Sequence, residues 1–179
     1  MIIKLRTAAL AALAWCLACA PSWVAAAFPT PYQPTPVQPA GVPQRYEFDL
    51  TAALRRGQRE HKRLYVYLGA SDCPYCRRYE AFLERHADEL VSHFAKDYLV
   101  IDLRSNLSVT ADRLYFRVAD KSLPYAEFMR AIGDERARLL VYPSVWLLDG
   151  NAKPLMQMPA GTGTFETVPE QLEILRLEQ

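Results

Sequence analysis

Two cysteines separated by a Pro-Tyr pair, Cys73 and Cys76, have the types and spacing best suited to chemistry in this chain. They follow the apolar run Leu64 to Leu68 and open a segment with helical periodicity. Two cysteines at this spacing in the first turn of a helix can close a disulfide with little backbone movement. The unpaired N–H groups and dipole of a helix start favour a thiolate at the first cysteine, and the thiolate is the form that attacks disulfides. The pattern predicts a redox-active dithiol.

The residues around the pair fit a helix start but leave its electrostatics open. Pro74 suits the first helical turn, where its missing N–H is not needed. Arg77 and Arg78 add positive potential, whereas Asp72 on the other side opposes it. The net sign of these charges is therefore undecided.

Metal binding is the alternative chemistry for Cys73 and Cys76. The only nitrogen ligands available are His61, His86 and His93, and none has a spacing to the cysteines that is typical of a zinc site. A copper carrier is a comparable minority interpretation, because no methionine lies near the pair. We expect no metal and no cofactor.

The amino terminus has the pattern of a secretory signal. Two basic residues precede an apolar stretch from Ala8 to Ala20, and small residues follow up to Ala27. This pattern predicts a signal peptide over residues 1–27, with Phe28 as the first mature residue. We therefore expect an exported, periplasmic protein, although an uncleaved membrane anchor stays open because the apolar stretch is only somewhat short for a bilayer span.

A second Cys-x-x-Cys pair, Cys16 and Cys19, lies inside the apolar signal stretch. It has neither a helix start nor water around it, so we exclude it as a dithiol; lipidation at Cys19 is a minority alternative. The mature chain then holds one cysteine pair, which closes too small a loop to stabilise much of the chain. Its purpose is more plausibly chemical than structural.

Composition limits the remaining classes. A chain of 179 residues with 51% hydrophobic content is long enough for one well-cored domain. Its formal net charge is +1 and it has no basic run, so we expect no nucleic-acid partner. Prolines crowd residues 28–45, which we interpret as an extended linker, either a tether or an unstructured tail. We place the globular domain at residues 46–179.

Hydrophobic periodicity predicts an alternating order of helices and strands. A strand, a helix and a second strand in succession imply parallel pairing with a right-handed crossover. The expected elements are a helix from Asp49 to about His61, strands at Leu64–Leu68 and Tyr98–Leu103, one long helix from Pro74 through Phe94, a short strand or hairpin within 105–121, a helix entered by Ser122 and Pro124 and ending at Gly133, a hairpin of Ser144–Leu148 with Pro154–Met158, and a final helix from Thr167.

Together these features resemble the thioredoxin superfamily, and most of all its secreted bacterial thioredoxin-like members. The resemblance rests on the Cys-x-x-Cys at a strand-to-helix junction and on Val141 to Asn151, which looks like the cis-proline region leading into a hairpin. It covers roughly residues 48 to 178, and the tetrad itself is like that of glutaredoxins. It implies an α/β, thioredoxin-like fold with a central mixed sheet flanked by helices.

By this resemblance, a cis peptide should precede Pro143 and lie beside the dithiol, where the backbone of Tyr142 can pair with a substrate strand. Tyr75 between the cysteines is expected to be exposed, and with Pro74 it completes the expected substrate-binding residues. Trp146 and Tyr79 could line the same groove, but core positions are the more ordinary interpretation for both.

Two departures from the family pattern bear on the mechanism. Thioredoxins carry a buried acidic residue six positions before the first cysteine, and here that position is Tyr67. This route for moving a proton at Cys76 is therefore missing. Residues 106–121 look like an insertion, which lengthens a loop or, less favoured, shapes a surface for a partner.

The expected function is an exported thiol-disulfide oxidoreductase that acts on protein thiols or disulfides. Cys73 would attack a substrate disulfide and Cys76 would resolve the mixed disulfide. We favour a reductase recharged by a membrane electron donor. The alternatives are an oxidase or isomerase, and a non-catalytic binding module that serves as a chaperone, adaptor or metal carrier.

Overall fold

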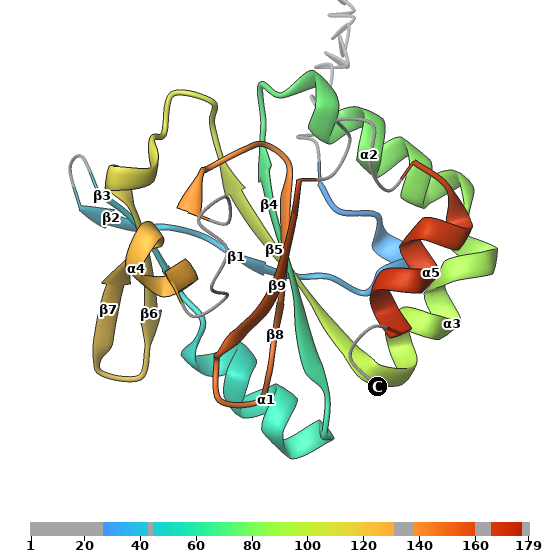
Figure 1. Ribbon diagram of the computed structural model, residues 1–179, viewed down its shortest axis with the longest axis horizontal. Coiled ribbons are helices and arrows are strands. Elements are labelled where there is room, and N and C mark those ends of the chain that lie inside the picture. The colour runs from blue at the N-terminus through green and yellow to red at the C-terminus, as the bar shows by residue number, and fades with distance from the viewer. Residues whose placement is uncertain (1–26, 43–44, 131–137, 160–165, 177–179) are drawn as a thin grey trace, which may run out of the picture.

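The structure is a computed structural model that describes residues 27–42, 45–130, 138–159 and 166–176 (Figure 1). Its strands form two sheets. The elements are η1 (Thr30–Tyr32), β1 (Thr35–Val37), β2 (Ala40–Val42), β3 (Arg45–Asp49), α1 (Thr51–Glu60), β4 (Arg63–Ala70), α2 (Pro74–Arg85), α3 (Ala87–Asp97), β5 (Tyr98–Ser105), η2 (Ala111–Arg113), β6 (Leu114–Val118), β7 (Lys121–Pro124), α4 (Tyr125–Met129), β8 (Ser144–Leu148), β9 (Pro154–Pro159) and α5 (Val168–Arg176), where η denotes a 3₁₀ turn.

The larger sheet has five strands in the order β1-β5-β4-β8-β9. Strands β1, β5 and β4 run parallel, β8 pairs antiparallel with β4, and β9 pairs antiparallel with β8. The parallel pairing of β4 with β5 across the two helices between them confirms the expected crossover. The topology confirms the predicted α/β, thioredoxin-like fold with a mixed sheet flanked by helices.

Strand β4 divides the core into two layers because its side chains alternate between the faces of the sheet. Leu64, Val66 and Leu68 pack with α1, α4 and the smaller sheet on one face. Tyr65 and Tyr67 pack on the other face with α2, α3, α5 and the N-terminal segment. Figure 1 shows α2, α3 and α5 on one side of the central strands and α4 with the smaller sheet on the other.

The predicted long helix is two helices, α2 and α3, which meet at His86. The backbone of His86 (φ −108°, ψ 22°) leaves the helical region, while its carbonyl accepts from Glu89 and Leu90 to begin the next helix. Asp88 and Glu89 in that first turn favour a new N-terminus through the helix dipole. The apolar stripe continues across the break, which explains why periodicity alone did not reveal it.

The proline-rich segment is not the extended linker that its composition predicted. Phe28 and Tyr32 are buried among core aromatic residues, and β1 pairs with β5 from Thr35 to Val37. Because β1 is the edge strand of its sheet, Pro36 occupies a position where a missing backbone donor is tolerated. The described fold therefore begins at Phe28 and not at residue 46.

The smaller sheet, β2-β3-β6-β7, includes strand β6 and the start of β7 from the region predicted to be an insertion. Strands β6 and β7 form the hairpin that alternation suggested, and β6 also pairs in parallel with β3. The favoured interpretation of 106–121 as a lengthened loop is therefore wrong. Ser122 does not cap a helix, because it lies in β7 and α4 begins only at Tyr125. Its hydroxyl group donates a hydrogen bond to the carboxylate of Glu47, which is buried. Gly133, the predicted end of that helix, lies outside the described residues.

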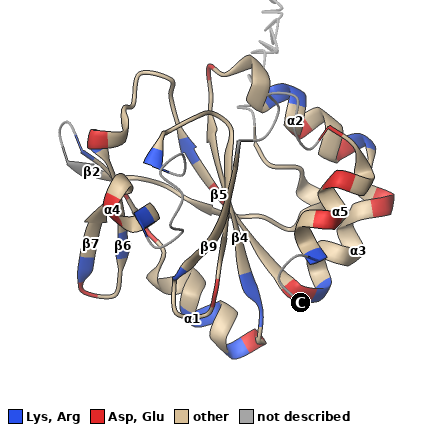
Figure 2. Cartoon of the chain, in the orientation of Figure 1, with Lys and Arg blue, Asp and Glu red and all other residues tan. Residues whose placement is uncertain are grey.

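The C-terminal elements follow the prediction closely. Strands β8 and β9 form the expected hairpin, and the backbone N–H of Thr167 donates to Glu170 Oε2 at 3.1 Å in a capping box at the start of α5. Basic and acidic residues occur together on each of α1, α2, α3 and α5 (Figure 2). Among the residues that the structure describes, no helix combines the length and apolar character needed to cross a membrane.

Candidate active site

The dithiol lies where β4 ends and α2 begins, with Cys73 as the N-cap of the helix. Its sulfur accepts the backbone N–H of Cys76 at 3.1 Å, so the first cysteine takes the place that a Ser or Asp side chain fills at other helix starts. Pro74 follows in the first turn and is exposed, as is Tyr75. Sequence reasoning placed all four tetrad residues at this junction.

Cys76 is buried on the inner face of α2, and Cys73 is buried as well. The backbone N–H of Ala70 donates to the Cys76 sulfur at 3.4 Å. Burial, together with the neighbouring Cys73 sulfur and the charge of Glu80, raises the pKa of the Cys76 thiol to about 12. Both cysteines are free thiols in this structure. At neutral pH the second thiol must therefore lose its proton during any reaction that uses it.

The peptide between Tyr142 and Pro143 is cis, as the resemblance implied. The side chain of Tyr142 packs against the cluster of Ala70, Cys73 and Cys76. Its hydroxyl group lies 3.3 Å from the Ser105 hydroxyl oxygen, and burial raises the pKa of Tyr142 to about 12. The cis-proline segment thus lies against the dithiol, with the phenol held neutral.

Apolar side chains are exposed next to the dithiol. Tyr75 is 52% exposed and Val141, which directly precedes the cis-proline pair, is 37% exposed. Leu107 is 47% exposed, and its backbone N–H donates to Asp72 Oδ1 at 2.9 Å, which holds its loop beside the dithiol. Trp146, in contrast, is fully buried as a core residue. The rim of the site offers apolar contact to an incoming chain.

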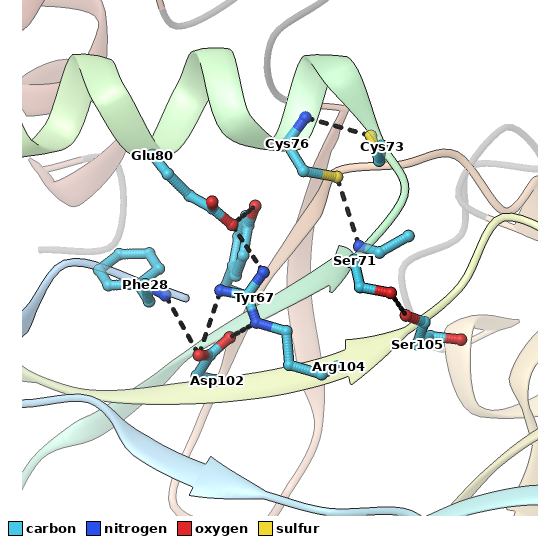
Figure 3. Close-up of polar contacts among 10 residues, drawn as sticks. Phe28, Tyr67, Ser71, Cys73, Cys76, Glu80, Asp102, Arg104 and Ser105 are labelled. Atoms are coloured by element: carbon cyan, nitrogen blue, oxygen red, sulfur yellow. Dashed lines mark hydrogen bonds and ion pairs between the residues drawn. The ribbon is translucent and has the colours of Figure 1, made fainter. Parts of the chain in front are cut away.

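Beneath Cys76 lies a buried charged cluster that spans three elements: Tyr67 from β4, Glu80 from α2, and Asp102 and Arg104 from β5 (Figure 3). The Tyr67 hydroxyl donates to Glu80 Oε1 at 2.8 Å. Arg104 Nη1 lies 2.6 Å from the same oxygen, and Arg104 Nε lies 2.9 Å from Asp102 Oδ1. One guanidinium thus bridges two buried carboxylates.

Glu80 is the residue that sequence reasoning missed. The sequence predicted no acidic residue near Cys76, because the position on β4 where thioredoxins have one is Tyr67. Glu80 approaches instead from α2, one turn after Cys76, and burial raises its pKa. The signal was present in the sequence, because positions 76, 79, 80 and 83 share the buried face of the helix and a charged residue there needs a partner.

Gly69 allows this cluster to form. A Cβ atom at position 69 would lie 2.6 Å from Arg104 Nη1 and 2.8 Å from a ring carbon of Tyr67. Because Arg104 is held by two carboxylates, it cannot swing away without breaking an ion pair. We expect Gly69→Ala to lower the free energy of unfolding by about 1–3 kcal/mol, the usual cost of overpacking, as measured by urea denaturation. A Gly150→Ala control, whose Cβ meets its nearest atom at 3.8 Å, should change it far less.

The described residues contain no group of three or more His, Cys, Asp and Glu side chains arranged to hold a metal ion. Of the candidate nitrogen ligands, His86 is engaged with Glu89, its Nδ1 lying 2.8 Å from Glu89 Oε1.

Fold and site together define a class: a thioredoxin-like domain with a dithiol at the start of its first crossover helix, facing a cis-proline. A search against protein-family models found no match, and no curated protein matched. Among solved structures, the chain is similar to a thioredoxin-fold protein from Helicobacter pylori, with 18% sequence identity, a TM-score of 0.43 and coverage of 66% of this chain and 70% of that one.

Proposed function

We propose that this protein is an exported thiol-disulfide oxidoreductase that reduces protein disulfides through Cys73 and Cys76. The observation that carries the proposal is the placement of two free thiols in the first turn of α2, against the cis Tyr142–Pro143 pair. Export rests on the amino-terminal sequence pattern.

The reaction divides into two exchanges. The Cys73 thiolate attacks one sulfur of a substrate disulfide, forms a new S–S bond to it, and releases the other substrate sulfur as a thiolate that takes up a proton. Cys76 then loses its proton and attacks the Cys73 sulfur, which releases the second substrate thiol and leaves a Cys73–Cys76 disulfide. Two electrons pass from the dithiol to the substrate. A dithiol donor in the membrane would return them.

The environment of Cys76 supports the reducing direction. A dithiol becomes a strong oxidant when its reduced form is stabilised. Here burial and the charge of Glu80 disfavour the Cys76 thiolate, so ionisation of Cys76 does not stabilise the reduced form. An oxidase or isomerase is the alternative. The redox potential of the Cys73/Cys76 pair distinguishes these activities, because a reductase should have a potential below that of glutathione and an oxidase a potential above it.

The exposed rim supports a protein substrate. Tyr75, Leu107 and Val141 offer apolar contact, and the backbone beside Pro143 can pair with an extended segment. An unfolded or extended chain that carries a disulfide would satisfy both features.

Trapping tests the proposal. In Cys76→Ala the first exchange can occur but the second cannot, so substrates should accumulate as mixed disulfides on Cys73. We would export the full-length variant in a bacterial host and separate the adducts by non-reducing electrophoresis, with Cys73→Ser/Cys76→Ala as the matched control. No adducts on Cys76→Ala above the background of the cysteine-free control would favour a binding module such as a chaperone or adaptor.

Glu80 is proposed to accept the proton of Cys76 during the second exchange. Glu80→Gln keeps the hydrogen-bonding shape but cannot accept a proton, so release of the mixed disulfide should slow by about 10²-fold, within the usual range for general-base catalysis. In the wild type, the pKa of Cys76 predicts that release accelerates as pH rises from 6 to 9. Stopped-flow fluorescence would measure the release rate of the Glu80→Gln variant and the pH dependence of release in the wild type. An unchanged rate in Glu80→Gln would assign Glu80 a purely structural role.

A further inference from the structure

The backbone nitrogen of Phe28 is buried against the charged cluster. It lies 3.2 Å from Asp102 Oδ2, on β5, and donates a hydrogen bond to it (Figure 3). The Phe28 ring is 1% exposed and contacts the rings of Tyr32, Tyr65 and Tyr67 edge-on, at centroid distances of 5.4, 6.1 and 5.2 Å. Ala27, one residue earlier, is exposed. The chain therefore enters the core at Phe28.

The cluster that receives this nitrogen carries unbalanced charge. Glu80 and Asp102 contribute two carboxylates. The guanidinium group of Arg104 forms an ion pair with each of them. Tyr67 contributes only a neutral hydroxyl. A buried group of this composition has a formal charge of −1, and an unpaired buried charge is costly. Burial raises the pKa of both carboxyl groups, in agreement with incomplete neutralisation.

We infer that Asp102 is a binding site for the α-ammonium group of Phe28, created when the chain is cut after Ala27. This inference rests on the export proposed above. Cleavage at that bond turns an amide N–H into a cationic amine at the position that already faces the carboxylate. The new charge brings the formal charge of the cluster to zero. Processing would thus complete the charged network that lies under Cys76.

The N-terminus of the mature protein tests the first half of this inference. The full-length chain would be produced in an exporting bacterial host, and the exported form analysed by intact mass spectrometry. A chain that begins at Phe28 is expected. A chain cut at another bond, or exported but left uncut as a membrane anchor, would overturn the inference but leave export standing, whereas a chain that is not exported at all would overturn both. Insulin reduction by the same sample would test the dithiol separately.

The reactivity of the amine tests the second half. Chains that begin at Phe28 and at Ala27 would be made from fusions cut in vitro, and each pulsed with acetic anhydride at pH 7. Ion pairing and burial should slow acetylation of the Phe28 α-amine at least about tenfold relative to the Ala27 α-amine, the effect of one pKa unit on the neutral fraction. Both chains should react equally after denaturation in urea. Equal rates in the folded chains would overturn the site.

Asp102→Asn in the chain that begins at Phe28 identifies the partner. It should raise the acetylation rate towards that of the Ala27 chain by removing the ion pair, and circular dichroism would verify that the variant is folded. Stability gives a second measurement that needs no substitution. A salt-bridged ammonium has a raised pKa in the folded state, so the Phe28 chain should be the more stable one at pH 7, and its advantage should vanish as pH rises through that pKa. An advantage that does not change with pH would contradict the ion pair.

Discussion

Replacing Cys73 with serine is expected to abolish the reduction of insulin by a dithiol donor, with a loss of at least about 10³-fold relative to the wild type, as for removal of a catalytic nucleophile. A serine hydroxyl has no accessible anion at neutral pH and cannot form the mixed disulfide. The rate should fall to that of the dithiol donor alone. The assay follows the turbidity of precipitating insulin chains.

The structure explains why this substitution separates chemistry from folding. Cys73 is the N-cap of α2 and accepts the backbone N–H of Cys76. Serine is a preferred N-cap residue, so Cys73→Ser should keep the helix start and leave the midpoint of urea denaturation nearly unchanged. Activity equal to that of the wild type would contradict the catalytic role of Cys73. Lost activity with a lowered midpoint would require the comparison to be repeated with Cys73→Ala.

Local patterns sufficed to predict the dithiol and the elements around it. The apolar run of β4, the helix start at Pro74 and the capping box at Thr167 are all encoded within a few neighbouring residues. The hairpin of β8 and β9 follows from two strand-forming runs separated by the Asp149-Gly150-Asn151 turn. These features depend on periodicity and backbone chemistry, which can be analysed without knowing what the residues contact.

The features that could not be predicted depend on partners distant in the chain. Prolines made residues 28–45 look like a linker, yet β1 pairs with β5, more than sixty positions later. The smaller sheet joins β3 to β6 across the whole β4–α3–β5 unit. Glu80 is buried because Arg104 meets it from another element. In each case tertiary contact overrides a local preference, and sequence periodicity does not report it.

The same long-range contact makes Arg104 the most sensitive position in the charged cluster. Its side chain is 15% exposed and bridges Glu80 and Asp102. Arg104→Ala would leave Glu80 buried without a cation and Asp102 without its guanidinium partner, and breaking a buried pair in this way typically costs about 3–5 kcal/mol. We expect a loss of this size in the free energy of unfolding at pH 7, measured by urea denaturation. Arg78→Ala is the matched control, because Arg78 forms a surface ion pair with Glu166 and its side chain is 62% exposed. This substitution should lower the free energy of unfolding by less than about 1 kcal/mol.

The pH dependence of this loss distinguishes an electrostatic role of Arg104 from simple packing. Burial already raises the pKa of Glu80 and Asp102, and removal of the guanidinium should raise both further. A carboxyl group whose pKa is higher in the folded state binds more protons there than in the unfolded chain, so stability increases as pH falls through the folded-state pKa. The deficit of Arg104→Ala should therefore be largest at pH 7 and shrink towards pH 5, as the carboxylates become neutral and no longer need a cation. A deficit that is constant between these pH values would mean that Arg104 stabilises the fold through the packing of its aliphatic chain, and not through its charge.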